Sequence, residues 1–313
     1  MPTDPAYEFV PRHLKEKEPE VFKLLAKFSE IIEEAVNFGS LVFKWCNESL
    51  EGKANKEVPL ILLFRHILEL LDAVSILIKE SSAEPCKLQL RSMFEALLSI
   101  NYILDDKKDE RAYAFLVCHA FKKIKTYRKL DPTTQHGRQF KGILKDSVLG
   151  DLDLSDLFDL PKMVEQQEEL FEKEGFREAY KELERLRRNG RKNPNWFEFY
   201  DGPSDLEQIA IELNKRDYYE ILYRHWSDYV HASDIITGNL GKTEKGTYLT
   251  SIRQPFEAQT ITSIAITMAL EAFRKMIKHY VPLQITHYKI WYMENMQKYY
   301  KKLSSQERII RRK

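Results

Sequence analysis

The sequence contains little glycine, little proline and few cysteines. Only 11 glycines and 12 prolines occur among 313 residues, and so few helix-breaking residues across long apolar and charged stretches favour long helices over many short strands. The three cysteines, Cys46, Cys86 and Cys118, are far apart and form no C-x-x-C pair. This pattern argues against a disulfide framework and favours a reducing compartment, so we expect a cytoplasmic protein.

The sequence also lacks an excess of charge of either sign. Its 49 Lys and Arg residues nearly balance its 48 Asp and Glu residues, which leaves a formal net charge of +1. Attraction to nucleic acid or to anionic lipid must therefore come from local patches. Three basic patches occur, at Lys122–Lys129, Arg185–Lys192 and Lys301–Lys313. Each could hold a phosphate backbone, although such runs are also typical of a solvated surface.

No segment predicts insertion into a membrane. The most apolar stretch, at residues 58–78, is long enough to span a bilayer but carries Arg65, His66, Glu69 and Asp72. Each charged residue there would cost roughly 2.5–3.5 kcal/mol at the bilayer centre, so we expect a core helix and no membrane partner. The sequence also lacks G-x-G-x-x-G, G-x4-G-K-[ST] and H-E-x-x-H motifs. We therefore expect no cofactor and no metal.

Apolar residues at helical spacing predict an all-α fold, a multi-helix bundle with an inserted helical arm. We expect one helical domain over residues 1–313, with its core in about 16–132 and 204–302 and a basic tail at 303–313. A short strand is predicted over about 247–253. The predicted helices cover about 19–50, 59–79, 85–104, 108–130, 215–236 and 255–280, and a last aromatic and basic helix follows Pro282.

The predicted arm covers about residues 133–203, where the composition changes. An acidic run at 151–156 is followed by a charged helical stretch at 162–188, and residues 189–194 break the helix. The whole segment has too few apolar residues to build a core by itself. We therefore interpret it as an insertion into the bundle.

The second and third predicted helices share a pattern of paired charges. Arg65 and Glu69 lie in one helix and Arg91 and Glu95 in the other, each pair at the i, i+4 spacing that lets opposite charges meet. Because both helices are otherwise strongly apolar, we expect both pairs to be at least partly buried. Burial of ions is costly unless partners compensate. The pairs are therefore either structural clamps or part of a polar site inside the bundle.

A second candidate site lies in the helix predicted over 215–236. At ~100° per residue, Arg224 and His231 lie within ~20° of each other, and Ser227 falls between them about 60° away. Arginine can hold a phosphate with its planar fork, and histidine can move a proton near neutral pH. An adjacent ribose 2′-hydroxyl could then be the nucleophile, without a metal. The opposite face carries Tyr219, Leu222, Trp226, Tyr229 and Val230.

A polar stripe of this kind is also typical of the solvated face of an amphipathic helix. The spacing alone leaves that alternative open.

Arg224 and His225, followed by five residues and His231, resemble the Arg-polar-x(4–6)-His signature of the HEPN superfamily (higher eukaryotes and prokaryotes nucleotide-binding domains). The resemblance implies a helical bundle, and many such proteins are metal-independent ribonucleases whose active sites form where two protomers meet. It implies that Arg224 contacts the scissile phosphate, that His231 is the acid or base, and that His225 takes the polar position, where Asn is more common. It also implies a homodimer and a protein partner such as an antitoxin.

A second resemblance covers more of the chain. The segment Leu90–Glu95 and the pattern Tyr219-x3-Tyr223-Arg224-x2-Ser227-x3-His231 are similar to an uncharacterised bacterial helical family (domain of unknown function family 5677). This likeness extends over roughly residues 58–280 and implies no activity.

Two functions therefore stand as expectations. The first is a metal-independent ribonuclease or RNA-binding protein that uses Arg224 and His231. The second is a non-catalytic helical module that binds a protein or a small ligand, with buried Arg/Glu pairs as clamps. Under the first, the supporting residues are Ser227, His225, Arg91, Glu95, Arg65 and Glu69.

Overall fold

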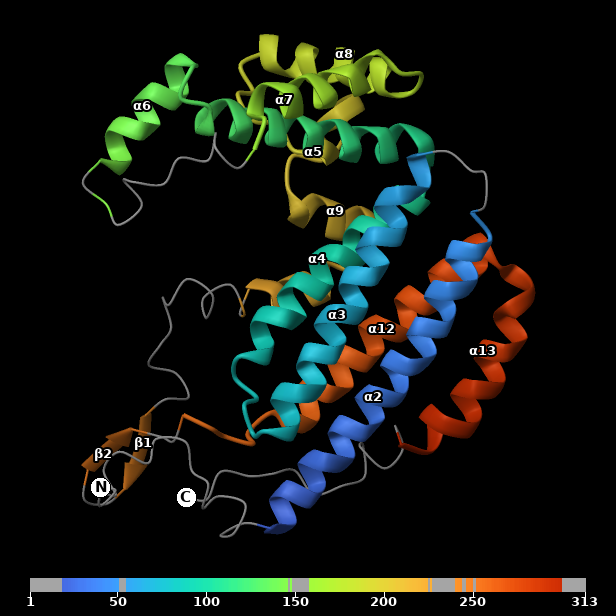
Figure 1. Ribbon diagram of the computed structural model, residues 1–313. Coiled ribbons are helices and arrows are strands. Elements are labelled where there is room, and N and C mark those ends of the chain that lie inside the picture. The colour runs from blue at the N-terminus through green and yellow to red at the C-terminus, as the bar shows by residue number, and fades with distance from the viewer. Residues whose placement is uncertain are drawn as a thin grey trace. The chain divides into compact units, whose positions relative to one another are not determined.

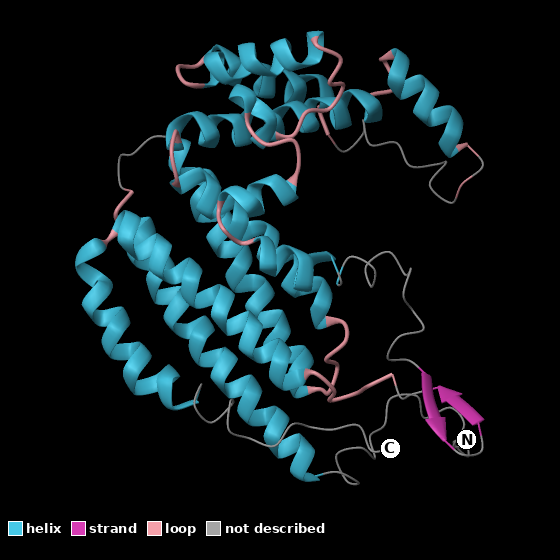
Figure 2. Cartoon of the chain, turned by 180° about the vertical axis from the view of Figure 1, so that it is seen from behind, coloured by secondary structure: helices cyan, strands magenta, loops and turns pink. Residues whose placement is uncertain are grey.

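The computed structural model describes residues 19–50, 55–145, 147, 158–224, 226, 240–243, 246–249 and 252–299. These residues are predominantly helical, and they include one antiparallel pair of short strands, β1 (Leu240–Thr243) and β2 (Gly246–Leu249) (Figure 2). The predicted all-α class is confirmed. The backbone forms two compact units: the described residues of the first fall in 19–50, 60–104 and 209–299, and those of the second in 55–59 and 105–208.

Four long helices lie in the described part of the first unit (Figure 1). They are α2 (Pro19–Glu48), α3 (Val58–Lys79), α4 (Cys86–Leu104) and α12 (Ala258–Tyr280). All four lie within a few residues of the predicted bounds, because prolines at 19, 59, 85 and 255 stand at or just before their first turns. Helix α12 packs against α2 and α4. Phenylalanines 28, 64, 94 and 273 are among the fully buried side chains of this core.

Helices α2 and α12 approach each other closely at Gly39. A β-carbon at this position would lie 2.4 Å from Leu68 Cδ2 and 2.8 Å from the ring of Phe273. Contacts this short do not occur between packed carbon atoms, so the missing side chain of Gly39 allows the close approach.

The C-terminal helices are fixed on the first described helix. After a 3-10 turn (Pro282–Gln284), the chain forms α13 (Ile285–Trp291) and a π-helical segment, η8 (Tyr292–Met296). The ring of Trp291 stacks on Phe38 of α2, with centroids 3.9 Å apart and an interplanar angle of 11°. Its indole Nε1 donates a hydrogen bond of 2.7 Å to Glu34 Oε1. One tryptophan therefore joins the two ends of the described chain.

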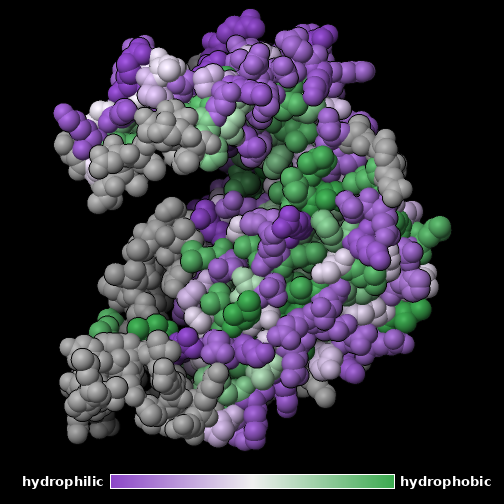
Figure 3. Space-filling model, viewed as in Figure 1, coloured by the Kyte–Doolittle hydropathy of each residue, from purple (hydrophilic) through white to green (hydrophobic). Residues whose placement is uncertain are grey.

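The second unit is organised around α5 (Lys108–Leu130), which packs against most of the other helical segments of this unit. Its partners are α6 (Gln135–Leu144), α7 (Leu160–Glu168), α8 (Phe176–Arg188) and the 3-10 segments η2 (Asn55–Glu57) and η5 (Trp196–Asp201); a further 3-10 segment, η4 (Glu169–Glu172), follows α7. The surface over α7 and α8 that Figure 3 displays is mainly hydrophilic. The buried cluster of the unit is formed by Ala114, Val117, Cys118, Ala120, Ile124, Phe171, Phe176, Ala179, Leu183 and Phe199.

This packing differs from the expected grouping of α5 with the long helices. Small residues of α5, such as Ala114 and Ala120, pack with large aromatic residues of the predicted arm, such as Phe171 and Phe199. The arm is poor in apolar residues because α5 supplies about half of the core that it needs. The helical stretch predicted over 162–188 is divided into α7, η4 and α8, and Gly175, whose φ of 81° lies in the left-handed region, precedes α8.

None of the helices within the described ranges combines the length and the apolar character that crossing a membrane requires.

Candidate functional site

The segment that carries the predicted motif is anchored on α4 by aromatic contacts. A single helical turn, α10 (Arg216–Tyr218), continues into a π-helical segment, η6 (Tyr219–Arg224). Phe94 of α4 stacks on Tyr218, with centroids 6.5 Å apart, and packs obliquely on Tyr223 at 6.0 Å. These contacts fix the segment against the core of the first unit.

A polar contact holds the start of the same segment. Lys215 Nζ lies 2.7 Å from Glu271 Oε2 of α12, and the other carboxylate oxygen of Glu271 accepts a hydrogen bond of 2.8 Å from Asn101 Nδ2 of α4. Asn101 is buried, and its Oδ1 has no hydrogen-bond partner among the described residues. The segment is therefore attached to both α4 and α12 before it reaches Tyr219.

Tyr223 is placed between the two charges of the predicted Arg91–Glu95 pair. Its hydroxyl accepts a hydrogen bond of 2.8 Å from Arg91 Nη2 and donates one of 2.8 Å to Glu95 Oε1. The direct distance between Arg91 Nη2 and Glu95 Oε1 is 3.5 Å. Each ion therefore lies closer to the Tyr223 hydroxyl than to the other ion.

The environment of Tyr223 keeps its hydroxyl protonated. Burial, followed by the hydrogen bond to the Glu95 carboxylate, raises the pKa of Tyr223 to about 12. At neutral pH the hydroxyl is therefore a stable donor to Glu95.

Arg91 is a constrained cation. Its Cζ lies 4.7 Å from the centroid of the Tyr223 ring, and only 21% of its side chain is exposed. The buried Nε has no hydrogen-bond partner among the described residues. Most buried donors in proteins have a partner, so this guanidinium keeps one hydrogen-bonding position that the described residues do not use.

Arg224 lies next to this anchored tyrosine and is open to solvent. Its side chain is 57% exposed, and its Nε lies 3.0 Å from Glu220 Oε2. Its Cζ also lies 5.8 Å from the centroid of the Tyr219 ring. The α-helical spacing assumed in the sequence analysis wrongly placed Tyr219 on the opposite face. The π-helical i→i+5 repeat brings residues 219 and 224 together.

The other residues of the predicted motif fall outside the described part of the chain. This applies to His225, Ser227 and His231. Their position relative to Arg224 stays a prediction. Trp226 is described, and it is buried, as expected for the apolar face.

The Arg65–Glu69 pair forms, but the expectation that it is buried is wrong. Arg65 Nη2 and Glu69 Oε1 are 2.9 Å apart, and the side chains are 61% and 54% exposed. They lie on a solvent-facing stripe of α3 that also contains Leu62 and Ile76, so apolar composition alone overestimated the burial of this helix. An exposed pair contributes little to stability. The nearby His66 Nε2 lies 3.3 Å from Ser92 Oγ and connects α3 to α4.

Sequence reasoning did not assign a role to Tyr223. The available signal was the repeat of tyrosine at 219 and 223 beside Arg224, which the family resemblance included without explanation. For metal binding, the described residues contain no group of three or more His, Cys, Asp or Glu side chains with suitable geometry.

The chain matches a family of unknown function (DUF5677) over residues 57–247. This match contains α3, α4, the second unit from residue 57 onward and the π-helical segment with Tyr223 and Arg224. Comparisons with curated proteins and with solved structures gave no match. Because the matched region covers more than half of the chain and includes the Arg91–Tyr223–Glu95 network, the chain belongs to this family of unknown function.

Proposed function

We propose that the protein is a metal-independent ribonuclease or RNA-binding protein whose site contains Arg224 and His231. One observation carries the proposal: Tyr223 is held between Arg91 and Glu95, and the next residue, Arg224, is exposed. A π-helical segment of this kind occurs often at functional sites.

The anchored tyrosine has a direct consequence for Arg224. Because the ring and hydroxyl of Tyr223 are both held by α4, the backbone at residue 223 has little freedom to rotate. Arg224 is therefore presented from a rigid element, which favours defined binding of a phosphate over a loose surface contact. In the absence of a ligand, the Glu220 carboxylate forms an ion pair with the Arg224 guanidinium. This ion pair holds the guanidinium in one orientation.

In the proposed reaction, Arg224 binds the scissile phosphate of an RNA strand. The ribose 2′-oxygen attacks the phosphorus, and the bond from phosphorus to the 5′-oxygen of the next nucleotide breaks. His231 takes the proton of the 2′-hydroxyl or supplies one to the leaving oxygen. The products are a 2′,3′-cyclic phosphate and a 5′-hydroxyl. Ser227 and His225 are proposed to support the phosphate, and Arg91 and Glu95 act as positioning residues through Tyr223.

The test is single-turnover cleavage of a mixed RNA in the presence of EDTA. We expect wild-type protein to release products with 2′,3′-cyclic phosphate ends, and we expect His231→Ala to lose at least about 100-fold in rate, as for removal of a general acid–base group. His287→Ala is the matched control, because His287 is an exposed histidine of α13. Equal cleavage by wild type and His231→Ala would overturn the catalytic role.

The proposal extends to the assembly of the protein. The likeness to HEPN proteins implies a homodimer that brings two Arg224 side chains together, a protein partner such as an antitoxin, and a cytoplasmic location where RNA is the substrate. Light scattering of the purified protein tests for the dimer.

A second function is favoured by the same Arg91–Tyr223–Glu95 network. If this network acts only as a clamp, the protein is a non-catalytic module that binds a protein or a small ligand. The exposed Arg65–Glu69 pair does not support this role, so the clamp is restricted to α4 and the π-helical segment. This alternative predicts that wild-type protein releases no cyclic phosphate in the cleavage assay.

A further inference from the structure

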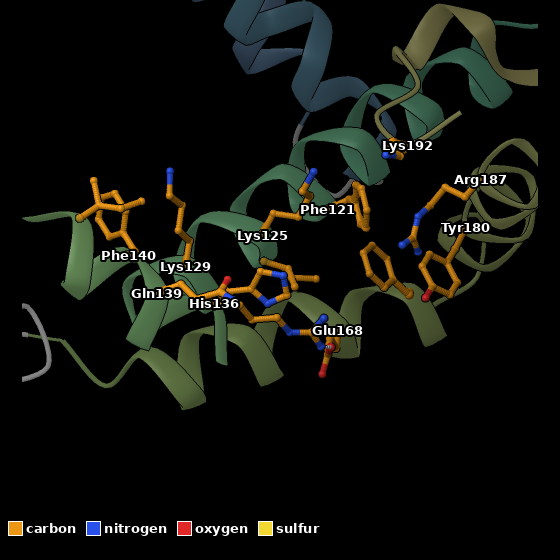
Figure 4. Close-up of a pocket in the computed structure, with 14 residues that line it drawn as sticks. Phe121, Lys125, Lys129, His136, Gln139, Phe140, Glu168, Tyr180, Arg187 and Lys192 are labelled. Carbon is orange, nitrogen blue, oxygen red and sulfur yellow. Dashed lines mark hydrogen bonds and ion pairs between the residues drawn. The ribbon is translucent and has the colours of Figure 1, made fainter. Parts of the chain in front are cut away.

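The second unit contains a cavity of about 520 Å³ that none of the motifs above explains. It lies among α5, α6, α7 and α8, and its size falls in the range of small-molecule sites. Figure 4 shows Lys129 and Phe140 on one side of it, Phe121, Tyr180 and Arg187 on the other, and His136 and Glu168 between them.

Two basic patches that are far apart in sequence meet at this cavity. Lys125, Arg128 and Lys129 belong to the patch on α5, and Arg187 and Lys192 belong to the patch at the end of α8. Five Lys and Arg side chains therefore line the cavity, against one carboxylate, Glu168. The third predicted patch, the tail at 301–313, lies outside the described residues.

Two of these five cations are paired with a carboxylate. Arg187 Nη1 lies 2.7 Å from Glu184 Oε1, one turn earlier on α8. Glu168 Oε1 accepts a hydrogen bond of 2.5 Å from Arg128 Nη2. Lys125 donates to the neutral amide oxygen of Asn193. Lys129 and Lys192 have no carboxylate partner within the described ranges. Three of the five lining cations therefore have no carboxylate partner among the described residues, and the cavity is positive although the chain as a whole is nearly neutral.

Aromatic rings alternate with these cations. Arg187 Cζ lies 4.8 Å and Lys125 Nζ 5.8 Å from the centroid of the Phe121 ring. Across the cavity, Lys129 Nζ lies 4.4 Å from the centroid of Phe140. The half-buried ring of Phe140 and the guanidinium of Arg187 are both surfaces on which a planar base can stack.

From this lining we infer that the cavity binds a nucleotide, with its phosphates on the lysine and arginine side chains and its base against the aromatic rings. Cations alone would fit any phosphate, whereas cation–aromatic pairs on two sides fit a ligand that combines anionic groups with a flat ring. The nucleotide is either a free mononucleotide or part of a single-stranded RNA. The inference is independent of the proposed ribonuclease function, because all lining residues belong to the second unit and Arg224 belongs to the first.

The test measures binding of three probes by isothermal titration calorimetry. The probes are ATP, inorganic triphosphate, which lacks a base, and a single-stranded RNA of eight nucleotides. We expect ATP or the RNA to bind at least about fivefold more tightly than triphosphate, since stacking of one base has an effect of this size. Tighter binding of ATP identifies a mononucleotide site, and tighter binding of the RNA identifies a strand-binding site.

Charge-matched variants locate the binding. The double variant Lys125→Gln/Arg187→Gln removes two lining cations, and Lys123→Gln/Arg188→Gln removes two neighbouring cations that do not line the cavity. We expect the first to weaken ATP or RNA binding at least about tenfold, with a smaller dependence of affinity on salt, and the second to change it less than about threefold.

A third variant tests the aromatic part. Phe140→Leu should weaken binding of the nucleotide probe at least about fivefold and leave binding of triphosphate unchanged. Three outcomes would each overturn the inference. They are equal losses of affinity in both double variants, equal affinities for ATP, RNA and triphosphate, and no binding of any probe.

Discussion

Replacing Tyr223 by phenylalanine removes one oxygen atom from the centre of the network on α4. That oxygen makes two hydrogen bonds of 2.8 Å, one from Arg91 and one to Glu95. Hydrogen bonds to charged groups contribute about 1.5–3 kcal/mol each. The two ions are already 3.5 Å apart and Glu95 is 40% exposed, so a direct ion pair and water replace part of the loss. We therefore expect the free energy of unfolding to fall by about 1–2 kcal/mol.

Urea unfolding followed by circular dichroism measures this change, with an unchanged dependence on urea concentration. Tyr292→Phe is the control, because the Tyr292 hydroxyl makes no hydrogen bond within the described part of the chain, and we expect a change below about 0.5 kcal/mol. A Tyr223→Phe protein that unfolds at the same urea concentration as wild type would refute the idea that the two hydrogen bonds of this hydroxyl stabilise the fold. Combining Tyr223→Phe with Glu95→Gln should give less than the sum of the two single effects, since both remove the same contact.

Two further predictions concern the cores. Gly39→Ala should lower the free energy of unfolding by about 1–3 kcal/mol, because the new methyl group would overlap the Phe273 ring. A melting temperature equal to that of wild type would contradict the close packing of α2 and α12. The three buried thiols should react with a thiol reagent such as DTNB only after unfolding, because burial raises their pKa from 9.0 to about 12, and rapid labelling of the native protein at pH 8 would contradict this. These thiols belong to Cys46, Cys86 and Cys118. Because the folded state favours the protonated thiol, their contribution to the free energy of unfolding is fully present below pH 9. It is lost as the pH rises toward 12.

The helices could be predicted from the sequence because their boundaries have local causes. Helix α5 begins at Lys108 and ends at Leu130, as predicted, since Asp131-Pro132 stops it. The packing partners of α5 could not be predicted in this way. Its small apolar residues fit either group of helices, and only the aromatic residues of the arm, such as Phe171, decide the choice.

The candidate site was predicted in part. The Arg91–Glu95 spacing indicated either a structural clamp or a polar site, and the structure adds Tyr223, which comes from a segment more than a hundred residues later. A π-helical segment has no simple sequence signature, so its effect on Arg224 and Tyr219 could not be foreseen. The cavity illustrates the same limit: two basic patches were visible in the sequence, but only the packing of α5 and α8 brings them together.

The tryptophan that joins α13 to α2 also sets an order of events during synthesis. Glu34 and Trp291 are 257 positions apart, so a ribosome that adds about 5–20 residues per second needs roughly 13 to 50 seconds to make the partner of Glu34. During this interval the apolar side of α2 lacks α13 and, for most of it, α12, while all described residues of the second unit are made before α12. The nascent chain therefore has to shield α2 until α13 emerges, and the second unit can bury its own core before then.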